Sequence, residues 1–250
     1  MVLIDVFILL FGLSIGSFYN VLAFRLLEGT SWIVPPSRCP HCRHRLGVWD
    51  LIPVLSYLFL RGRCRYCNAR ISPLYPLGEG LTALSFYLVY HQIGFQWELA
   101  VGWALASLLV LSLLTDLRAM LILDRITFPF LVILLLLRLF VGDEPWWWYV
   151  AGGLVGSGCL LMAAWLSRGG MGGGDIKLYL AVGIALGPWL TLLSIALAAF
   201  AGTVIGIFLR LTGRIRRRQP FPFAPFIWFG ALTAYLYGHD LWNAYLRLWQ

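Results

Sequence analysis

Charged residues are scarce in this sequence. Asp, Glu, Lys and Arg together make up only 12% of it, and lysine occurs once, at position 177. Soluble domains carry about a quarter charged residues, so the scarcity argues against an ordinary soluble fold. We also expect no cleavable signal peptide, because the first apolar run, residues 2–24, has no basic stretch before it and no small-residue cleavage site after it. We therefore expect this run to be retained as a helix.

Several functional signatures are missing as well. The sequence holds no Gly-rich nucleotide fingerprint and no nucleic-acid-binding module, so we expect no nucleic-acid partner despite a net charge of +8. The two halves of the chain show no convincing repeat, and the charged residues fall at the ends of the apolar runs. A transporter with a binding site at the bilayer midplane would show the opposite pattern.

Apolar residues make up 60% of the chain, and the mean hydropathy is +0.81. Apolar runs of membrane-spanning length recur from end to end. We predict an all-α polytopic membrane protein with about eight transmembrane helices, surrounded by membrane lipid. The predicted spans are residues 2–24, 77–95, 97–115, 126–142, 146–167, 175–190, 191–210 and 223–246. Residues 175–210 allow two readings: two helices divided at Gly187-Pro188, or one long tilted helix.

The distribution of basic residues favours two helices. With eight spans, 17 of the 19 Lys and Arg residues lie on one side of the membrane, and loops rich in Arg face the cytoplasm. One long helix would instead carry the basic run at residues 214–218 across the membrane. The sequence thus predicts a first helix over residues 1–25, a cytoplasmic domain over 26–76 and a membrane core over 77–250, with both termini outside.

Four cysteines stand in the predicted cytoplasmic domain with the spacing C-x2-C-x21-C-x2-C. They are Cys39, Cys42, Cys64 and Cys67. Two such pairs are typical of a tetrahedral structural Zn²⁺ site with no open position for chemistry, and a domain of this size benefits from a metal. The remaining alternatives are four reduced cysteines or a redox-active dithiol.

Three aspartates lie at predicted cytoplasmic helix ends: Asp116, Asp124 and Asp175. Ionisable residues at membrane depth indicate function by default, and two carboxylates that meet at one water can perform aspartyl-protease chemistry. Asp116 and Asp175 are the expected pair. Asp175 could equally be a helix N-cap, and Asp116 and Asp124 could be loop residues paired with nearby arginines.

Glycines surround Asp175 on its N-terminal side, five of them within six residues. Gly172 and Gly174 have no side chains, so we expect another backbone, such as an extended substrate, to approach Asp175 closely there. Lys177 either marks the membrane interface or influences the acidity of Asp175.

These motifs together resemble the bacterial type IV prepilin peptidases, which belong to the GxGD aspartyl proteases. The matching stretches are GLSIGSFYNVLAFRL at 12–26, SRCPHCRHRL at 37–46, DLIPVLSYLFLRGRCRYC at 50–67, ISPLYPLGE at 71–79, TDLRAMLILDRITFP at 115–129 and GMGGGDIKL at 170–178. The resemblance covers nearly the whole chain, and the paired CxxC motifs make it specific.

The resemblance implies an inner-membrane endopeptidase that cleaves the basic leader of prepilins or pseudopilins on the cytoplasmic side. It also implies N-methylation of the new N-terminus with S-adenosylmethionine. By the same resemblance Asp116 and Asp175 are catalytic, the four cysteines bind zinc, and Asp124 occupies a further acidic position. The family often has proline before that second acid, where this chain has Leu123.

The N-terminal motif has its own physical interpretation. Gly12 and Gly16 form a small-xxx-small face suited to tight helix packing. Asn20 and Arg25 are candidates to bind backbone carbonyls or a substrate terminus, and Glu79 is a candidate partner for the pilin N-terminal amine. Two other classes stay open at this point: a transporter, or an inactive membrane scaffold stabilised by zinc.

Overall fold

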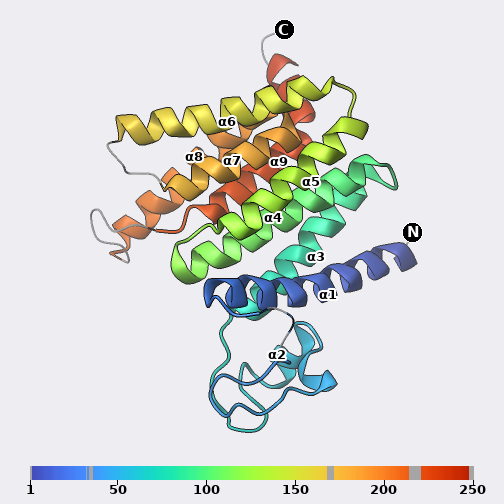
Figure 1. The fold of residues 1–250 in the computed structure, drawn as a ribbon, viewed down its shortest axis with the longest axis vertical. Helices are drawn as coiled ribbons and strands as arrows, with labels where there is room; N and C mark the ends of the chain where they lie inside the picture. The colour runs from blue at the N-terminus through green and yellow to red at the C-terminus, as the bar shows by residue number, and fades with distance from the viewer. Residues whose placement is uncertain (1, 32, 34–35, 168–171, 214–220, 248–250) are drawn as a thin grey trace. The chain divides into compact units, whose positions relative to one another are not determined.

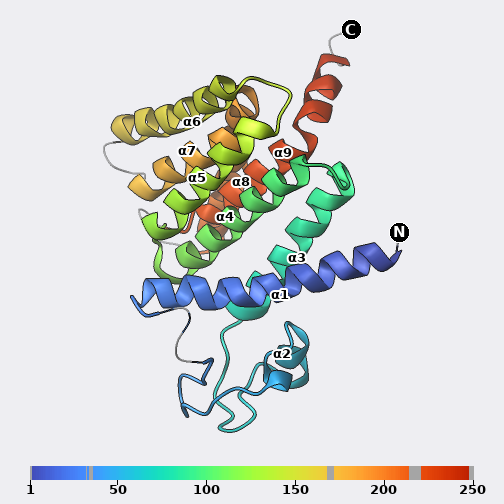
Figure 2. The same ribbon diagram turned by 45° about the vertical axis from the view of Figure 1, so that its right-hand side comes forward.

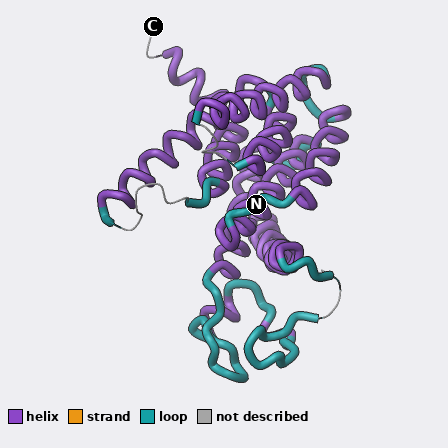
Figure 3. The backbone as a smooth tube through the Cα atoms, turned by 60° about the vertical axis from the view of Figure 1, so that its left-hand side comes forward, coloured by secondary structure: helices purple, strands orange, loops and turns teal. Residues whose placement is uncertain are grey.

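The computed structural model describes residues 2–31, 33, 36–167, 172–213 and 221–247. Within these ranges the chain consists of helices and loops without a strand (Figure 3). Two isolated β-bridges, Arg38–Arg45 and Arg63–Arg70, are the extended pairings present there. The chain divides into two compact units, Met1–His91 and Gln92–Gln250.

The first unit contains two long helices and an irregular domain between them. Its elements are α1 (Val2–Leu27), the 3-10 helix η1 (Val48–Asp50), α2 (Leu55–Phe59) and α3 (Leu74–Ile93). At Gly12 and Gly16 of α1, an added Cβ would lie 2.6 Å from the Ala83 Cα and 2.7 Å from the Glu79 Cα, respectively. The predicted tight packing through these glycines is therefore confirmed, and its partner is α3.

The described residues of the second unit form a bundle of helices (Figures 1 and 2). They are α4 (Glu98–Ala119), α5 (Asp124–Phe140), α6 (Trp146–Leu166), α7 (Gly173–Leu186), α8 (Pro188–Leu211) and α9 (Ala224–Arg247). Helix α4 is buried along most of its length and contacts α5, α7 and α9. It is the centre of this unit, and its end carries Asp116.

Each of the eight predicted helices is present, with ends that differ by only a few residues from those expected. The long tilted helix is excluded, because α7 ends and α8 begins at Gly187. That residue has a φ of +75°, which glycine adopts readily. Pro188 then opens α8, and proline favours this position because its missing N–H has no helical partner there.

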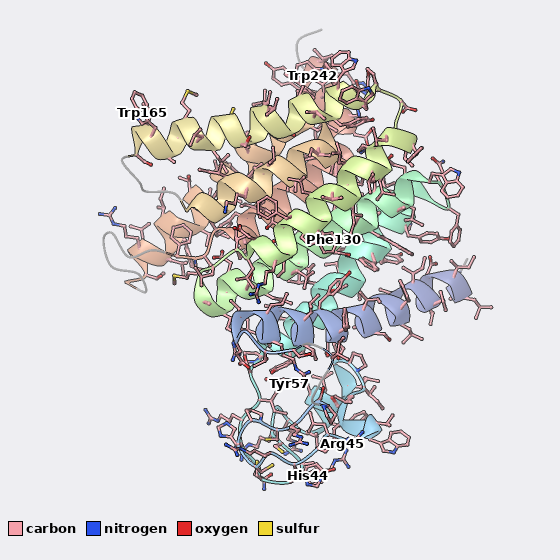
Figure 4. The ribbon with its side chains drawn as sticks, in the orientation of Figure 1. His44, Arg45, Tyr57, Phe130, Trp165 and Trp242 are labelled. Carbon is pink, nitrogen blue, oxygen red and sulfur yellow. The ribbon has the colours of Figure 1, made fainter. Side chains whose placement is uncertain are left out.

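Four helices are long and apolar enough to cross a membrane: α1, α4, α6 and α8. The chain is accordingly a membrane protein, while eight spans and a three-part division of the chain stay predictions. Large apolar side chains such as Trp165, Phe140 and Phe208 are exposed on the outside of the helices, and Trp165 projects from the end of α6 (Figure 4). The basic run at 214–218 lies outside the described residues.

Candidate active site and metal centre

Asp116 and Asp175 are carried by two helices that contact each other, α4 and α7. Asp116 lies in the last turn of α4, where Met120 turns left-handed with a φ of +55° and donates its N–H to the Asp116 carbonyl. Asp175 is the third residue of α7, and its own N–H bonds the Gly172 carbonyl at 3.2 Å. Helix ends thus set the position of both aspartates.

The two carboxylates are close enough for their charges to interact directly. Asp116 is only 7% exposed, and its Oδ2 accepts a hydrogen bond of 2.8 Å from the N–H of Ala224, the first residue of α9. Asp175 is half-buried. The N-cap of α7 is Gly172, and the Asp175 carboxylate, three residues later, accepts a hydrogen bond from the Gly172 N–H. The N-cap interpretation of Asp175 is therefore wrong.

Glycine contacts with α6 hold α7 in place. A Cβ added to Gly152 or Gly183 would collide with the backbone of the facing helix, and one added to Gly156 would lie 2.8 Å from the carbonyl oxygen of Tyr179. Glycines allow this close approach because they have no side chain. The line of glycines on α6, which sequence reasoning did not single out, is the reason that α7 lies flush against its neighbour.

Asp124 and Lys177 form an ion pair that joins the first turns of α5 and α7. Lys177 Nζ lies 2.7 and 2.9 Å from the two Asp124 oxygens, and it also lies 5.8 Å from the centre of the Phe128 ring. About half of each side chain is exposed, so the pair contributes about 0–1 kcal/mol. Among the described residues, the carboxylate that pairs with Lys177 is Asp124. The structure therefore does not support a direct effect of Lys177 on the acidity of Asp175.

Gly174 faces the loop between α4 and α5. A Cβ at this position would lie 2.9 Å from the Cβ of Ile122, so the absence of a side chain makes room for Ile122 of this protein's own loop. Gly172 is exposed, and a Cβ there would lie 3.4 Å from Asp175 Oδ2. Close approach of a substrate at these two glycines stays a prediction.

Gly174→Val is expected to lower the kcat/KM of peptide cleavage by at least about tenfold, or about 1.4 kcal/mol in transition-state stabilisation. The added side chain must displace Ile122 and with it the loop that follows Asp116. Steady-state cleavage kinetics measure the effect. Gly173→Ala is the matched control, since a Cβ at Gly173 meets no atom within 4 Å. Equal activity of the two variants would contradict this account.

The four cysteines of the first unit form one cluster. The Sγ atoms of Cys39, Cys42, Cys64 and Cys67 all lie within 4.8 Å of one another. The Cys39 and Cys67 sulfurs are 3.8 Å apart, and tetrahedral Zn–S bonds of about 2.3 Å place two sulfurs about 3.8 Å apart. These residues therefore fit a zinc ion, and all four ligand positions would come from the protein.

The two cysteine pairs have the same backbone geometry. In each loop the first cysteine accepts an N–H from the residue four positions later, Arg43 in one and Asn68 in the other, both at 2.9 Å. Arg43 and Asn68 also share a positive φ, 56° and 58°. Burial raises the pKa of the Cys39 thiol, but hydrogen bonds from the Cys42 and His41 N–H groups and from the Cys64 and Cys42 thiols together lower it to about 7. Cys39 therefore reaches the thiolate, the form that binds metal, more readily than an isolated cysteine does.

Asp50 is a structural anchor of this domain that the sequence alone did not single out. Its carboxylate accepts hydrogen bonds from the Gly47 N–H at 3.1 Å, Arg65 Nε at 2.8 Å and the Tyr66 hydroxyl at 3.2 Å. Although burial alone would raise the pKa of Asp50, these donors hold it below its usual value. Arg65 and Tyr66 lie between the second pair of cysteines, so Asp50 fixes that loop.

The three substrate-binding candidates of the first unit already have partners within it. Asn20, only 1% exposed, donates from Nδ2 to the Tyr75 carbonyl at 2.8 Å. Arg25 donates to the Ser31 carbonyl at 3.2 Å. Their roles toward a substrate stay predictions.

Glu79, at the start of α3, is buried and accepts the Val54 N–H at 2.7 Å. Val54 has a φ of +60°, which is rare for a β-branched residue. Glu79 thus ties the helix to a strained turn of the cysteine domain. A role toward the pilin amine stays a prediction for this carboxylate as well.

Comparison with known proteins gives a consistent result over both units. Residues 10–93 match the bacterial peptidase A24 N-terminal domain, and residues 103–207 match the type IV leader peptidase family. A Bacillus subtilis (strain 168) protein named prepilin leader peptidase/N-methyltransferase is 38% identical over 239 residues, which cover 96% of each chain.

Two relatives with the same name are more distant. The protein of Aeromonas salmonicida (strain A449) is 34% identical over 96% of this chain and 92% of its own length. The protein of Neisseria gonorrhoeae is 29% identical over 93% of this chain and 90% of its own length. No solved structure matches the chain.

Proposed function

Because this chain belongs to the type IV leader peptidase family, we propose that Asp116 and Asp175 are the two carboxylates with which it cleaves prepilins. The chain is a protease of the prepilin-processing class with N-methyltransferase activity. The observation that carries the assignment of the dyad is that α4 and α7 contact each other with the charge of Asp116 acting on Asp175.

The dyad would work through one water molecule. Two neighbouring carboxyl groups share a proton, because both cannot ionise comfortably together. The ionised member takes a proton from the water, whose oxygen attacks the carbonyl carbon of the scissile peptide. The protonated member gives its proton to the carbonyl oxygen, which forms a tetrahedral gem-diol. On collapse the first carboxyl gives the proton taken from water to the leaving nitrogen, and a gem-diol hydroxyl returns its proton to the other carboxylate, so that the leader acid and the new amine are released and the dyad is restored. The hydrogen bond from Ala224 orients the Asp116 carboxylate for this work.

The proposed site faces the cytoplasm at the inner membrane of a bacterium. Its support is the distribution of charge, since 17 of 19 basic residues fall on one side when eight helices span the bilayer. The cysteine domain then lies on the same side as the dyad. This placement suits a substrate whose basic leader stays in the cytoplasm. Either a prepilin or a pseudopilin precursor fits this description of the substrate.

Zinc is proposed as a structural ion held by Cys39, Cys42, Cys64 and Cys67. When bound it would hold the two cysteine loops together and supply no catalytic chemistry, because every ligand position is filled by protein. S-adenosylmethionine is the proposed methyl donor, implied by the methyltransferase name of the relatives.

Cleavage in detergent solution tests the function directly. The purified protein and a synthetic prepilin peptide should give two products, the leader and a mature fragment with a free N-terminus, identified by mass. A transporter or an inactive zinc-stabilised scaffold would leave the peptide intact. Neither alternative is favoured by the family, and neither explains why Asp116 and Asp175 meet.

The mature fragment is expected to gain one methyl group when S-adenosylmethionine is added. The methyl group passes from the sulfonium to the N-terminal amine, which loses a proton. Mass spectrometry of the product, with and without the donor, measures the transfer. A fully cleaved product that never gains the mass of a methyl group, at saturating donor, would show that this chain lacks the second activity.

A further inference from the structure

A hydrogen-bonded group of buried and half-buried residues lies at the opposite ends of α4 and α7 from the two aspartates. Arg138, in the last turn of α5 and 7% exposed, places Nη1 2.8 Å from Glu98 Oε2. It donates to the Ala185 carbonyl from Nη2 and also from Nε, the latter at 3.1 Å. The Tyr235 hydroxyl donates to Glu98 Oε1 at 2.7 Å, and the Tyr149 ring centre lies 4.3 Å from Arg138 Cζ. We call these five residues the far-end cluster.

The far-end cluster joins the two helices that carry the aspartates. Glu98 is the first residue of α4, about 27 Å along the helix from Asp116 at 1.5 Å per residue. Ala185 is near the end of α7, about 15 Å from Asp175 by the same measure. Arg138 therefore binds the far ends of both helices at once, from a third helix that contacts each of them.

The near ends are joined too. Lys177 of α7 pairs with Asp124, the first residue of α5. Helices α5 and α7 are thus attached at two points, one close to Asp175 and one at Ala185. Helices α4 and α9 show the same arrangement, with Ala224 bound to Asp116 and Tyr235 bound to Glu98.

Charged side chains inside a membrane protein are costly and are kept where they pair with one another or with backbone carbonyls. Close packing at Gly152 and Gly183 holds α7 against α6, but apolar contacts are non-directional. A planar guanidinium that donates in fixed directions to a carboxylate and to a carbonyl sets the position of a helix along its axis.

We propose that Arg138, together with Glu98, is a positioning residue for peptide cleavage. It fixes α7 along its axis against α4, so that Asp175 stays opposite Asp116. This inference rests on the dyad proposed above. Catalysis is sensitive to such alignment, because a displacement of about 1 Å far from the chemistry can lower a rate by about a hundredfold.

The test is the kinetics of Arg138→Gln and Glu98→Gln in the full-length membrane protein. We expect kcat for prepilin cleavage to fall by about tenfold or more, and KM to change by less than about twofold, because the substrate contacts are untouched. Methylation of a peptide that already starts at the mature N-terminus should stay within about twofold. Arg247→Gln and Glu144→Gln are the controls, since both residues are exposed.

Two further variants sharpen the result. Arg138→Lys keeps the charge next to Glu98 but lacks the forked donors, so it should restore only part of kcat. The double variant of Arg138 and Glu98 should be little worse than either single one, because residues that act as a unit are not additive. If Arg138→Gln fails to fold, Tyr235→Phe decides, since it removes one hydroxyl from Glu98 and should lower kcat with KM unchanged.

Unchanged cleavage in Arg138→Gln and Glu98→Gln would overturn the proposal. Equal loss of cleavage and methylation would also overturn it, because the cluster would then serve folding alone. The dyad proposal has its own test. If Asp116→Asn still cleaves the prepilin, the proposed dyad is wrong, whatever the result for Arg138→Gln. An inactive Asp116→Asn variant beside fully active far-end variants would refute this inference alone.

Discussion

Asp116→Asn and Asp175→Asn are each expected to abolish prepilin cleavage while the protein stays folded in the membrane. Asparagine keeps the size of the side chain and can still accept the Ala224 N–H that binds Asp116. It cannot take a proton from water or deliver one to a carbonyl oxygen. Because a dyad acts as a unit, each single change should cost nearly as much as both together. Product formation, measured at equal protein concentration, gives the result.

Asp124→Asn is the control for this pair. Asp124 is a half-exposed partner of Lys177, so its change should weaken the link between α5 and α7 and lower activity only mildly. Substantial cleavage by either Asp116→Asn or Asp175→Asn would refute the mechanism. An inactive Asp124→Asn beside an active Asp116→Asn would keep the peptidase and reassign the dyad.

Cys39→Ser or Cys64→Ser is expected to remove bound zinc and unfold the cysteine domain. Both sulfurs are buried, and structural zinc in small domains binds with about 10–16 kcal/mol, which is also folding free energy. The loss of one ligand should therefore expose residues 36–71 to protease, while the membrane helices stay intact. Elemental analysis gives the zinc content, and limited proteolysis followed by mass analysis locates the cuts.

Cys159→Ser serves as the matched control, because this cysteine lies in α6 and outside the cluster. It should retain zinc and show the wild-type digestion pattern. A wild-type protein that purifies without zinc, with free thiols and a protease-resistant cysteine domain, would contradict the structural role of the metal.

The sequence by itself determined the class of protein and pointed to the residues that we propose carry its chemistry. Long apolar runs must become helices, because backbone polar groups in lipid have no other partners. The eight helices were predicted on this ground, and Gly187-Pro188 marked the break between α7 and α8 because glycine allows a positive φ that other residues resist. Cysteine spacing indicated the metal cluster for a similar reason, since two short loops suffice to bring four sulfurs together.

The tertiary structure decided which residues meet. Lys177 was ambiguous in the sequence and pairs with Asp124, and Gly174 makes room for Ile122. Arg138 and Glu98, 40 residues apart, attracted no notice in the sequence. The physical reason is that local patterns specify a helix and its ends, whereas the neighbour of a buried charge depends on how the helices pack. Contacts between distant helices are therefore the information that the fold added, and the far-end cluster is built entirely from such contacts.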